Sequence, residues 1–315
     1  MLNISACIIT NNNHSVLNAI ESVYTSVNEI ILVNTVPEFT MDISKYDKVK
    51  LYNFKWCDDF SKARNYSISK ATGDWIFCID SDEVLKTSFD SVKDDHDFYF
   101  LQIENNKTLY DSIRIFKNHI GIKYANRLHE SVEDSVLELG LKGAKSEVIL
   151  GHTGYQLDDK GMEEKWKRNY RILLKDKKNP GRNIHMAKHF NYLKDFKKAI
   201  YYAHKALKQN NINDENKAIL CIMIYEGYKN MGMKEAGIDY LRLSIQFLPM
   251  QISARYLLVN YLYQLSNKKH FKEAILKQII AIGSLITFRN SELPNEVYCD
   301  INYVNNIRKE IEKWQ

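Results

Sequence analysis

One apolar segment of the chain ends abruptly in carboxylates: it reads Gly73-Asp74-Trp75-Ile76-Phe77-Cys78-Ile79-Asp80-Ser81-Asp82-Glu83. Its apolar part has the character of a buried strand. Because side chains alternate along a strand, Asp80 and Asp82 are expected on one face. The end of a strand is where an α/β sheet presents its ligand site. Clustered carboxylates attract a hard divalent cation, which usually keeps open positions for phosphate oxygens. The segment therefore predicts a site for a metal-bound diphosphate, with a simple helix cap as the alternative.

The composition of the chain is that of an ordinary globular protein, with 315 residues, 45% hydrophobic and 26% charged residues. A net charge of +5 suits anionic ligands but falls short of the basic patches of nucleic-acid binders. The five cysteines form no C-x-x-C pair, so reduced thiols in a cytoplasmic protein are expected. The sequence predicts neither a signal peptide nor a membrane span.

The first half of the chain alternates strands and helices, which predicts a mostly parallel sheet covered by helices. The expected strands are Ile4 to Thr10, Glu29 to Thr35, Lys48 to Phe54, the strand into Asp80, Phe98 to Glu104, Ser112 to Phe116 and Glu147 to Leu150. The expected helices are Ser15 to Ser26 and Ser61 to Ala71.

The second half is helical from about Met162 and contains an internal repeat. The repeated motifs are Phe196-Lys197-Lys198-Ala199-Ile200, Met233-Lys234-Glu235-Ala236-Gly237 and Phe271-Lys272-Glu273-Ala274-Ile275, at spacings of 37 and 38 residues. The alanine of each motif is expected to let paired helices approach closely. The pattern is similar to tetratricopeptide repeats, whose period is about 34, and a plain helical bundle is the alternative. We expect a catalytic domain over residues 1–160 and a helical repeat domain over residues 161–315.

A second motif lies just before the acidic segment and reads Trp56-Cys57-Asp58-Asp59-Phe60-Ser61-Lys62-Ala63-Arg64-Asn65. Asp59 or Ser61 is expected to cap a helix that presents Arg64 near its start. Arg64 then either donates to phosphate or pairs with Asp58 or Asp59.

Three further segments follow in order: Arg114-Ile115-Phe116-Lys117-Asn118, Arg127-Leu128-His129-Glu130 and Ile149-Leu150-Gly151-His152-Thr153-Gly154-Tyr155. A last one reads Lys165-Trp166-Lys167-Arg168-Asn169. In order and spacing, these motifs resemble the family 2 inverting glycosyltransferases, in the branch of bacterial lipopolysaccharide-core and bacteriocin-peptide or flagellin glycosyltransferases. The resemblance implies a GT-A fold, a Rossmann-like α/β domain, here followed by an all-α tetratricopeptide-like domain.

The resemblance also implies roles for particular residues. Asp82 and His152 are expected to hold a divalent metal, Mn²⁺ or Mg²⁺. Glu130 is the candidate base that takes the acceptor proton, with His129 as the second candidate; pairing of Glu130 with Arg127 is the structural alternative. The residues expected to bind the nucleotide sugar are Thr10, Asn12, Asn34, Asp59, Arg64, Asp80, Ser81, Lys165 and Arg168. Lys165 and Arg168 could also belong to a solvated basic face with Lys167, Arg171 and Lys175.

The chain departs from the family pattern where the nucleotide is expected to bind. Asn34 stands where the family has an aspartate that accepts a hydrogen bond from uracil, and an amide oxygen accepts more weakly. The first loop reads Asn11-Asn12-Asn13-His14 in place of the family's K-N-E-E.

The sequence thus predicts a metal-dependent inverting glycosyltransferase. It would move a hexose or N-acetylhexosamine from a UDP-linked donor to a peptide, protein or glycan acceptor. The alternative is a weakened or non-catalytic module that binds peptides through the helical repeats. A nucleotidyltransferase would also use paired carboxylates, but the chain lacks a Gly-rich phosphate loop. No nucleic-acid partner is expected, and a homodimer through the helical domain is left open.

Overall fold

The computed structural model describes residues 2–105, 108–152, 159–210, 212–265, 267–288 and 299–314. It divides into two compact units, Met1–Asn179 and Pro180–Gln315. The sequence placed the boundary earlier, after residue 160, which lies at the start of helix α4 (Asp159–Lys175). By its contacts α4 lies with the first unit, because Arg171 and Lys175 of this helix pair with Asp58.

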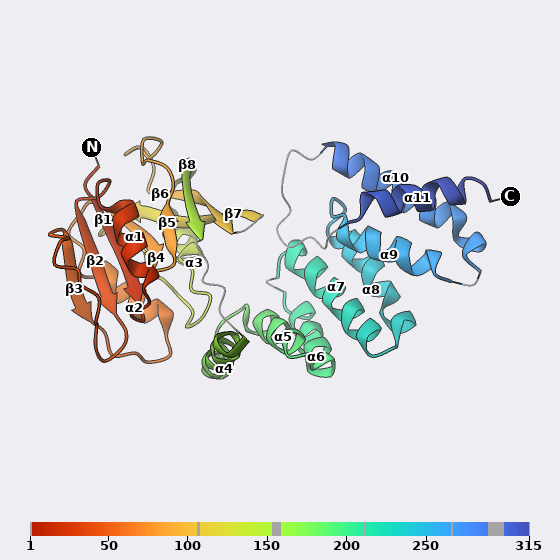
Figure 1. Cartoon of the computed structure of the whole chain (residues 1–315), viewed down its shortest axis with the longest axis horizontal. Helices are drawn as coiled ribbons and strands as arrows, with labels where there is room; N and C mark the ends of the chain where they lie inside the picture. Colours follow the sequence, from red (N-terminus) through yellow and green to blue (C-terminus); the bar gives the residue numbers. More distant parts are fainter. Residues whose placement is uncertain are drawn as a thin grey trace. The chain divides into compact units, whose positions relative to one another are not determined.

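The first unit is built on one mixed sheet (Figure 1). Its strand order is β3-β2-β1-β4-β7-β6-β8-β5. The strands are β1 (Ile4–Thr10), β2 (Glu29–Asn34), β3 (Val49–Asn53), β4 (Trp75–Asp80), β5 (Glu83–Leu85), β6 (Phe98–Asn105), β7 (Thr108–Lys117) and β8 (Gly143–His152). Strands β1 to β4 pair in parallel, as the alternation of strands and helices predicted. Strand β7 then joins β4 in the antiparallel direction, so the later strands make the sheet mixed.

Helices cover both faces of this sheet. Helix α1 (Ser15–Val23) buries Val16 and Ile20 against one face, in a cluster that contains Ile8 of β1. The neighbouring side chain on β1, Cys7, points to the other face and packs in the cluster that includes residues of α3 (Glu133–Glu138). Helix α2 (Phe60–Ile68) borders this second cluster with Tyr66 and Ile68. The strands are apolar on both faces because both faces are covered.

The register of the parallel strands decides where a ligand can bind. Thr10 lies opposite Asn34, and Ile9 lies opposite Asp80. The last residues of β1, β2 and β4 therefore share one edge of the sheet, which is the edge where such folds bind ligands.

The second unit contains three successive helix pairs and a last helix. They are α5 (Arg182–Tyr192) and α6 (Phe196–Leu207), α7 (Asp214–Asn230) and α8 (Lys234–Phe247), α9 (Ser253–Tyr263) and α10 (Lys272–Phe288), with a short 3₁₀ turn η1 (Lys268–Phe271), and finally α11 (Ile301–Ile311). The three repeated motifs lie at the starts of α6, α8 and α10, so the predicted helix-pair repeat is confirmed.

The predicted role of the repeated alanine is wrong for two of the three motifs. Ala199 is buried, whereas Ala236 and Ala274 are exposed. The position that follows the alanine is buried in every motif, as Ile200, Gly237 or Ile275. The fifth residue of each motif therefore lies on the buried side of its helix.

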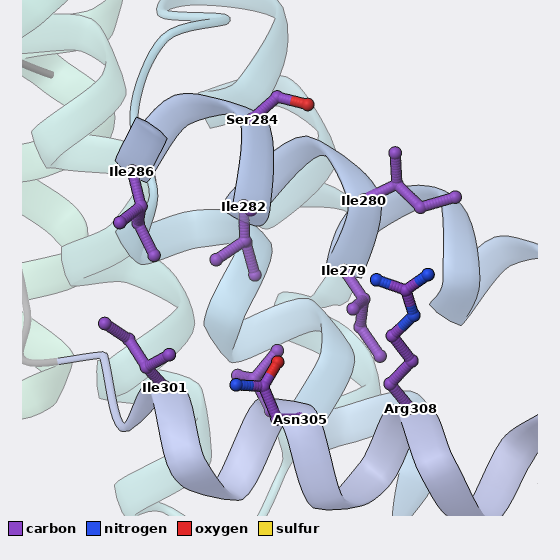
Figure 2. Close-up of a pocket in the computed structure, with 10 residues that line it drawn as sticks. Ile279, Ile280, Ile282, Ser284, Ile286, Ile301, Asn305 and Arg308 are labelled. Carbon is purple, nitrogen blue, oxygen red and sulfur yellow. The ribbon is translucent and has the colours of Figure 1, made fainter. Parts of the chain in front are cut away.

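A hollow of about 390 Å³ lies between α10 and α11 in the second unit (Figure 2). Isoleucines dominate its walls, among them Ile279, Ile282 and Ile301, with Arg308 at its side. None of the described residues that line it is acidic, so it offers no carboxylate for a metal-bound diphosphate. Among the described residues, no helix is long and apolar enough to cross a membrane.

Candidate functional site

The acidic turn at the end of β4 is held by two arginines. Asp80 Oδ1 accepts a hydrogen bond from Arg64 Nη2 at 2.5 Å, and its Oδ2 accepts one from Arg114 Nη2 at 3.1 Å. Burial opposes ionisation of Asp80, but the charges of Arg114 and Arg64 keep its pKa well below the ordinary value. Asp80 is therefore an ionised carboxylate whose oxygens are both engaged by protein groups.

Glu83 lies beneath this turn and is only 1% exposed. Its Oε2 accepts the backbone N–H of Asp80 at 2.9 Å, and its Oε1 accepts from Arg114 Nη2 at 3.2 Å. Burial, and then the neighbouring charge of Asp80, raise the pKa of Glu83. The sequence quoted Glu83 and Arg114 within motifs but gave neither a role. The third carboxylate in four positions was the signal for Glu83.

Arg64 connects the acidic turn to the candidate base. Asp59 caps α2 by accepting the backbone N–H of Lys62 at 3.1 Å, as predicted. The helix then presents Arg64, whose Nε donates to Glu130 Oε1 at 2.6 Å while its Nη2 donates to Asp80. The alternative pairing of Arg64 with Asp58 or Asp59 is therefore wrong.

Glu130 does not pair with Arg127 either. Arg127 Nη1 instead lies 3.7 Å from Asp59 Oδ2 and donates to the carbonyl of Asp58 at 3.3 Å. Leu128 and His129 separate Arg127 from Glu130 in the sequence, and His129 is exposed and has a positive φ of 54°. The left-handed turn at His129 lets Glu130 point to Arg64 while Arg127 points to the start of α2.

Asp82 and His152 face each other, although they lie far apart in the sequence. Strand β5 pairs with β8 so that Glu83 is opposite His152. His152 Nε2 consequently lies 3.3 Å from Asp82 Oδ2, and both side chains are partly exposed. Among the described residues, no group of three or more His, Cys, Asp or Glu side chains that could hold a metal ion is present. Thr153, Gly154 and Tyr155 of the same motif lie outside the described residues.

The loops after β1 and β2 carry the residues expected to bind the nucleotide. Thr10 Oγ1 accepts the backbone N–H of Asn12 at 3.0 Å, and Asn12 has a positive φ of 65°. Asn34 is fully buried, and its Oδ1 accepts the backbone N–H of Val36 at 3.3 Å. The amide oxygen proposed for the nucleobase is thus engaged within its own loop. Ser81 is 9% exposed in the acidic turn.

Some basic residues of helix α4 contact other elements of the first unit, and others do not. Arg168 lies over the ring of Phe60 at 5.3 Å, and burial lowers its pKa, whereas Lys165 is exposed. Arg171 and Lys175 donate to the carboxylate of Asp58 at 2.9 and 2.6 Å. Both side chains are more than half exposed, so they lie on a solvated basic face, as the alternative interpretation had it, and also pair with Asp58.

The charges around the acidic turn do not balance. Three carboxylates pair with two guanidinium groups, which leaves one negative charge in excess when all five groups are ionised; the five residues are Asp80, Glu83, Glu130, Arg64 and Arg114. Asp82 adds a further, partly exposed carboxylate beside them. An excess of carboxylates favours a hard cation. The residues present therefore fit a divalent ion, with Asp82 and His152 as the side chains that would hold it.

Comparison with known proteins agrees with the geometry of the first unit. Residues 5–91 match the family model "Glycosyl transferase family 2". The chain is 25% identical over 358 aligned residues to the SPbeta prophage-derived glycosyltransferase SunS of Bacillus subtilis, an alignment that covers 98% of this chain and 82% of SunS. It is 29% identical over 197 residues to a TPR repeat-containing protein of Synechococcus elongatus, covering 56% of this chain and 49% of that protein. The chain thus spans about half the length of that relative.

Among solved structures, a mannosyltransferase from Pyrobaculum calidifontis in complex with GDP-Man and Mn²⁺ aligns at 11% identity with a TM-score of 0.44. That alignment covers 92% of this chain and 88% of the mannosyltransferase.

The parallel sheet, the acidic turn at its carboxyl edge and the matched family model make the first unit similar to the glycosyltransferases of family 2. The predicted resemblance to family 2 is confirmed, and the domain of this type begins with β1 and includes the acidic turn. The predicted fold class, a GT-A-type α/β domain followed by tetratricopeptide-like helices, is confirmed as well.

Proposed function

We propose that the chain is a metal-dependent inverting glycosyltransferase that moves a hexose or N-acetylhexosamine from a UDP-linked sugar. The single observation that carries this proposal is the Asp82–His152 pair at 3.3 Å beside the Asp80 turn. This pair lies at the edge of the sheet where Thr10, Asn34 and Asp80 end their strands.

In this proposal Asp82 and His152 hold Mn²⁺ or Mg²⁺. The ion would supply positive charge to the departing diphosphate, which is the chemistry that a leaving nucleotide requires. Arg168, packed over Phe60, is the side chain of α4 best placed to add a second positive charge. Lys165, being exposed, would reach a diphosphate only from the solvent side.

Glu130 is the proposed base. Its Oε1 accepts the hydrogen bond from Arg64, so Oε2 is the atom that would take the proton of the acceptor. Arg64 orients the carboxylate through this contact. His129 remains the second candidate, because it is exposed next to Glu130.

The acceptor is proposed to be a peptide, protein or glycan that the helical unit holds. Stacked helix pairs make extended surfaces suited to such ligands. A cytoplasmic location is proposed on the ground that all five cysteines are free thiols, and a homodimer through the helical unit is part of the same proposal.

Nucleotide release by slow donor hydrolysis tests this function without a known acceptor. The protein is incubated with Mn²⁺ and a panel of UDP- and GDP-linked sugars. We expect release from one donor, and a loss of about a hundredfold in Asp82→Asn, because the ligand pair is broken. Asp90→Asn, an exposed carboxylate of the same unit, is the matched control and should keep the wild-type rate. An unchanged rate in Asp82→Asn would remove the proposed metal role.

One observation favours a second candidate, a binding module without catalysis. Asn34 is fully buried and its amide oxygen already accepts a hydrogen bond from Val36. A nucleobase would then lack its acceptor. Calorimetric titration of the same sugar nucleotides with Mn²⁺ separates the two candidates, because the binding module should show no heat of donor binding.

A further inference from the structure

Five side chains of the first unit form a continuous series of ion pairs. The series runs from Glu83 through Arg114, Asp80 and Arg64 to Glu130, with successive distances of 3.2, 3.1, 2.5 and 2.6 Å. Four of the five side chains are no more than 12% exposed, and Asp80 is 29% exposed. The series therefore runs mostly beneath the surface, from the acidic turn to the proposed base.

We propose that Glu83 and Arg114 are positioning residues for Glu130, acting through Asp80 and Arg64. This inference rests on the proposed function, in which Glu130 is the base. Glu83 is almost completely buried and so is not offered as a group that touches the donor or the acceptor.

The planar guanidinium of Arg64 couples the position of Asp80 to the position of Glu130. Arg64 binds Asp80 through Nη2 and Glu130 through Nε, and these two atoms belong to one rigid plane. The place of Asp80 therefore fixes the direction in which Arg64 meets Glu130. Burial strengthens each link, because charges attract more strongly away from water.

Asp80 is in turn fixed from two sides. Glu83 accepts its backbone N–H at 2.9 Å, and Arg114 binds both its carboxylate and that of Glu83. Glu83→Gln would replace one acceptor oxygen by an N–H₂ group, which cannot accept from either donor. One of the two contacts would then be lost, and the carboxylate of Asp80 would be held less firmly.

A buried glutamate elsewhere in the same sheet provides a matched control. Glu29 is also buried, and it accepts from Ser5 Oγ at 2.6 Å and from Lys50 Nζ at 2.6 Å. It begins β2 and pairs with Ser5, so it lies at the opposite ends of the parallel strands from Asp80. Glu29→Gln should therefore weaken the fold without moving Glu130.

A stability cycle tests the coupling without any donor. Urea unfolding is measured for Glu83→Gln, Glu130→Gln and the double variant, and again with Glu29→Gln in place of Glu83→Gln. We expect the Glu83 and Glu130 substitutions to be non-additive by about fivefold or more in the unfolding equilibrium constant. The Glu29 and Glu130 substitutions should be additive. Additivity in both cycles would overturn the inference.

A kinetic test uses the donor that gives nucleotide release, with water as the acceptor. Glu83→Gln should lower kcat by about tenfold or more, because a misplaced base loses much of its effect. Its donor dissociation constant should stay within about twofold of wild type, and it should cost nothing further in the Glu130→Gln background. A rate loss no larger than that of Glu29→Gln, or a loss confined to donor affinity, would contradict the proposal.

The two tests also allow for a variant that does not fold and for a wild-type protein that releases no nucleotide. If Glu83→Gln does not fold, Arg114→Lys takes its place in both tests. A lysine side chain is shorter and lacks the Nη2 atom from which Arg114 donates to both carboxylates. If the wild-type protein releases no nucleotide from any donor, the proposed function fails, and the stability cycle alone still decides whether Glu83 and Glu130 are coupled.

Discussion

Arg64 is a buried arginine that pairs with two carboxylates. Its guanidinium is 7% exposed and satisfies two carboxylates, Asp80 and Glu130. Burial disfavours its charge, but Asp80 and Glu130 raise the pKa of Arg64 well above its ordinary value. A charged pair of this kind is costly to build and more costly to break, because removal of one partner strands the other.

Arg64→Gln should therefore destabilise the first unit by about 3 kcal/mol, since it leaves Glu130 without its cation and Asp80 with Arg114 alone. Urea unfolding measures this loss. Arg308→Gln is the matched control, because Arg308 pairs with Glu312 on the surface of α11 and such pairs contribute only about 0.5 kcal/mol. Equal losses in the two variants would show that Arg64 is not held as the structure indicates.

The sequence indicated the residues of the site better than their partners. Asp80, Asp82, Glu130 and His152 were all chosen from motifs, and the structure brings Asp82 and His152 within 3.3 Å. The partners of Arg64 could not be found in the same way. Asp58 and Asp59 are its neighbours in sequence, whereas its real partners come from β4 and from the segment before α3, which only the fold brings together.

At the scale of the helix pair, contact between α7 and α8 depends on a residue without a side chain. A Cβ at Gly237 would lie 3.0 Å from the backbone Cα of Tyr225. A Cβ at Gly283 of α10 would meet nothing within 4 Å. Both glycines lie inside helices, so they form a matched pair that separates packing from helix propensity.

Gly237→Ala should lower stability by about 1 kcal/mol, because overpacking against backbone outweighs the gain in helix propensity. Gly283→Ala should raise it by about 0.5–1 kcal/mol through the propensity gain alone. Thermal unfolding of the two variants measures both effects. A stabilising Gly237→Ala would mean that α7 and α8 are less closely packed than the structure shows.

Strand and helix positions follow local patterns, which explains why most were predicted. The strand over Ile4–Thr10 was predicted to the residue, because its apolar run ends in a cluster of asparagines. Two elements among the described residues of the first unit were not predicted. Strand β5 has three residues and α3 has six, and neither is long enough to show a period. The missed β5 matters most, because its pairing with β8 is what brings His152 to Asp82.

At the scale of the whole molecule, acid should act unevenly on the two units. Burial opposes ionisation of Glu29, but hydrogen bonds from Lys50, Ser5 and Thr72 lower its pKa to about 2. Hydrogen bonds from Lys175 and Arg171 lower the pKa of Asp58 to about 2. Folded-state pKa values below the unfolded ones stabilise the fold above about pH 4.5, and this contribution is lost as the pH falls towards 2.

Calorimetry of the full chain should therefore show a transition of the first unit that moves down by several degrees between pH 5 and pH 3. Glu29→Gln identifies the first unit's transition. This substitution should lower the midpoint temperature of that transition at pH 7 and make the midpoint less dependent on pH. Asp214 is an exposed carboxylate in the first turn of α7, in the second unit. Asp214→Asn is therefore the control, and it should not change the midpoint of the first unit's transition. A parallel acid shift of both transitions in wild type and in Glu29→Gln would contradict this account.

The division of the chain after Asn179 has a consequence for how such proteins can be recombined. A crossover at residue 160 looks natural in the sequence, because the helical half begins there. It would give α4 to the incoming repeats and separate Arg171 and Lys175 from Asp58, which would be left as a buried anion without its cations. Chimaeras that exchange the repeat array should therefore fold when they are joined at Pro180, with α4 inherited together with the catalytic sheet.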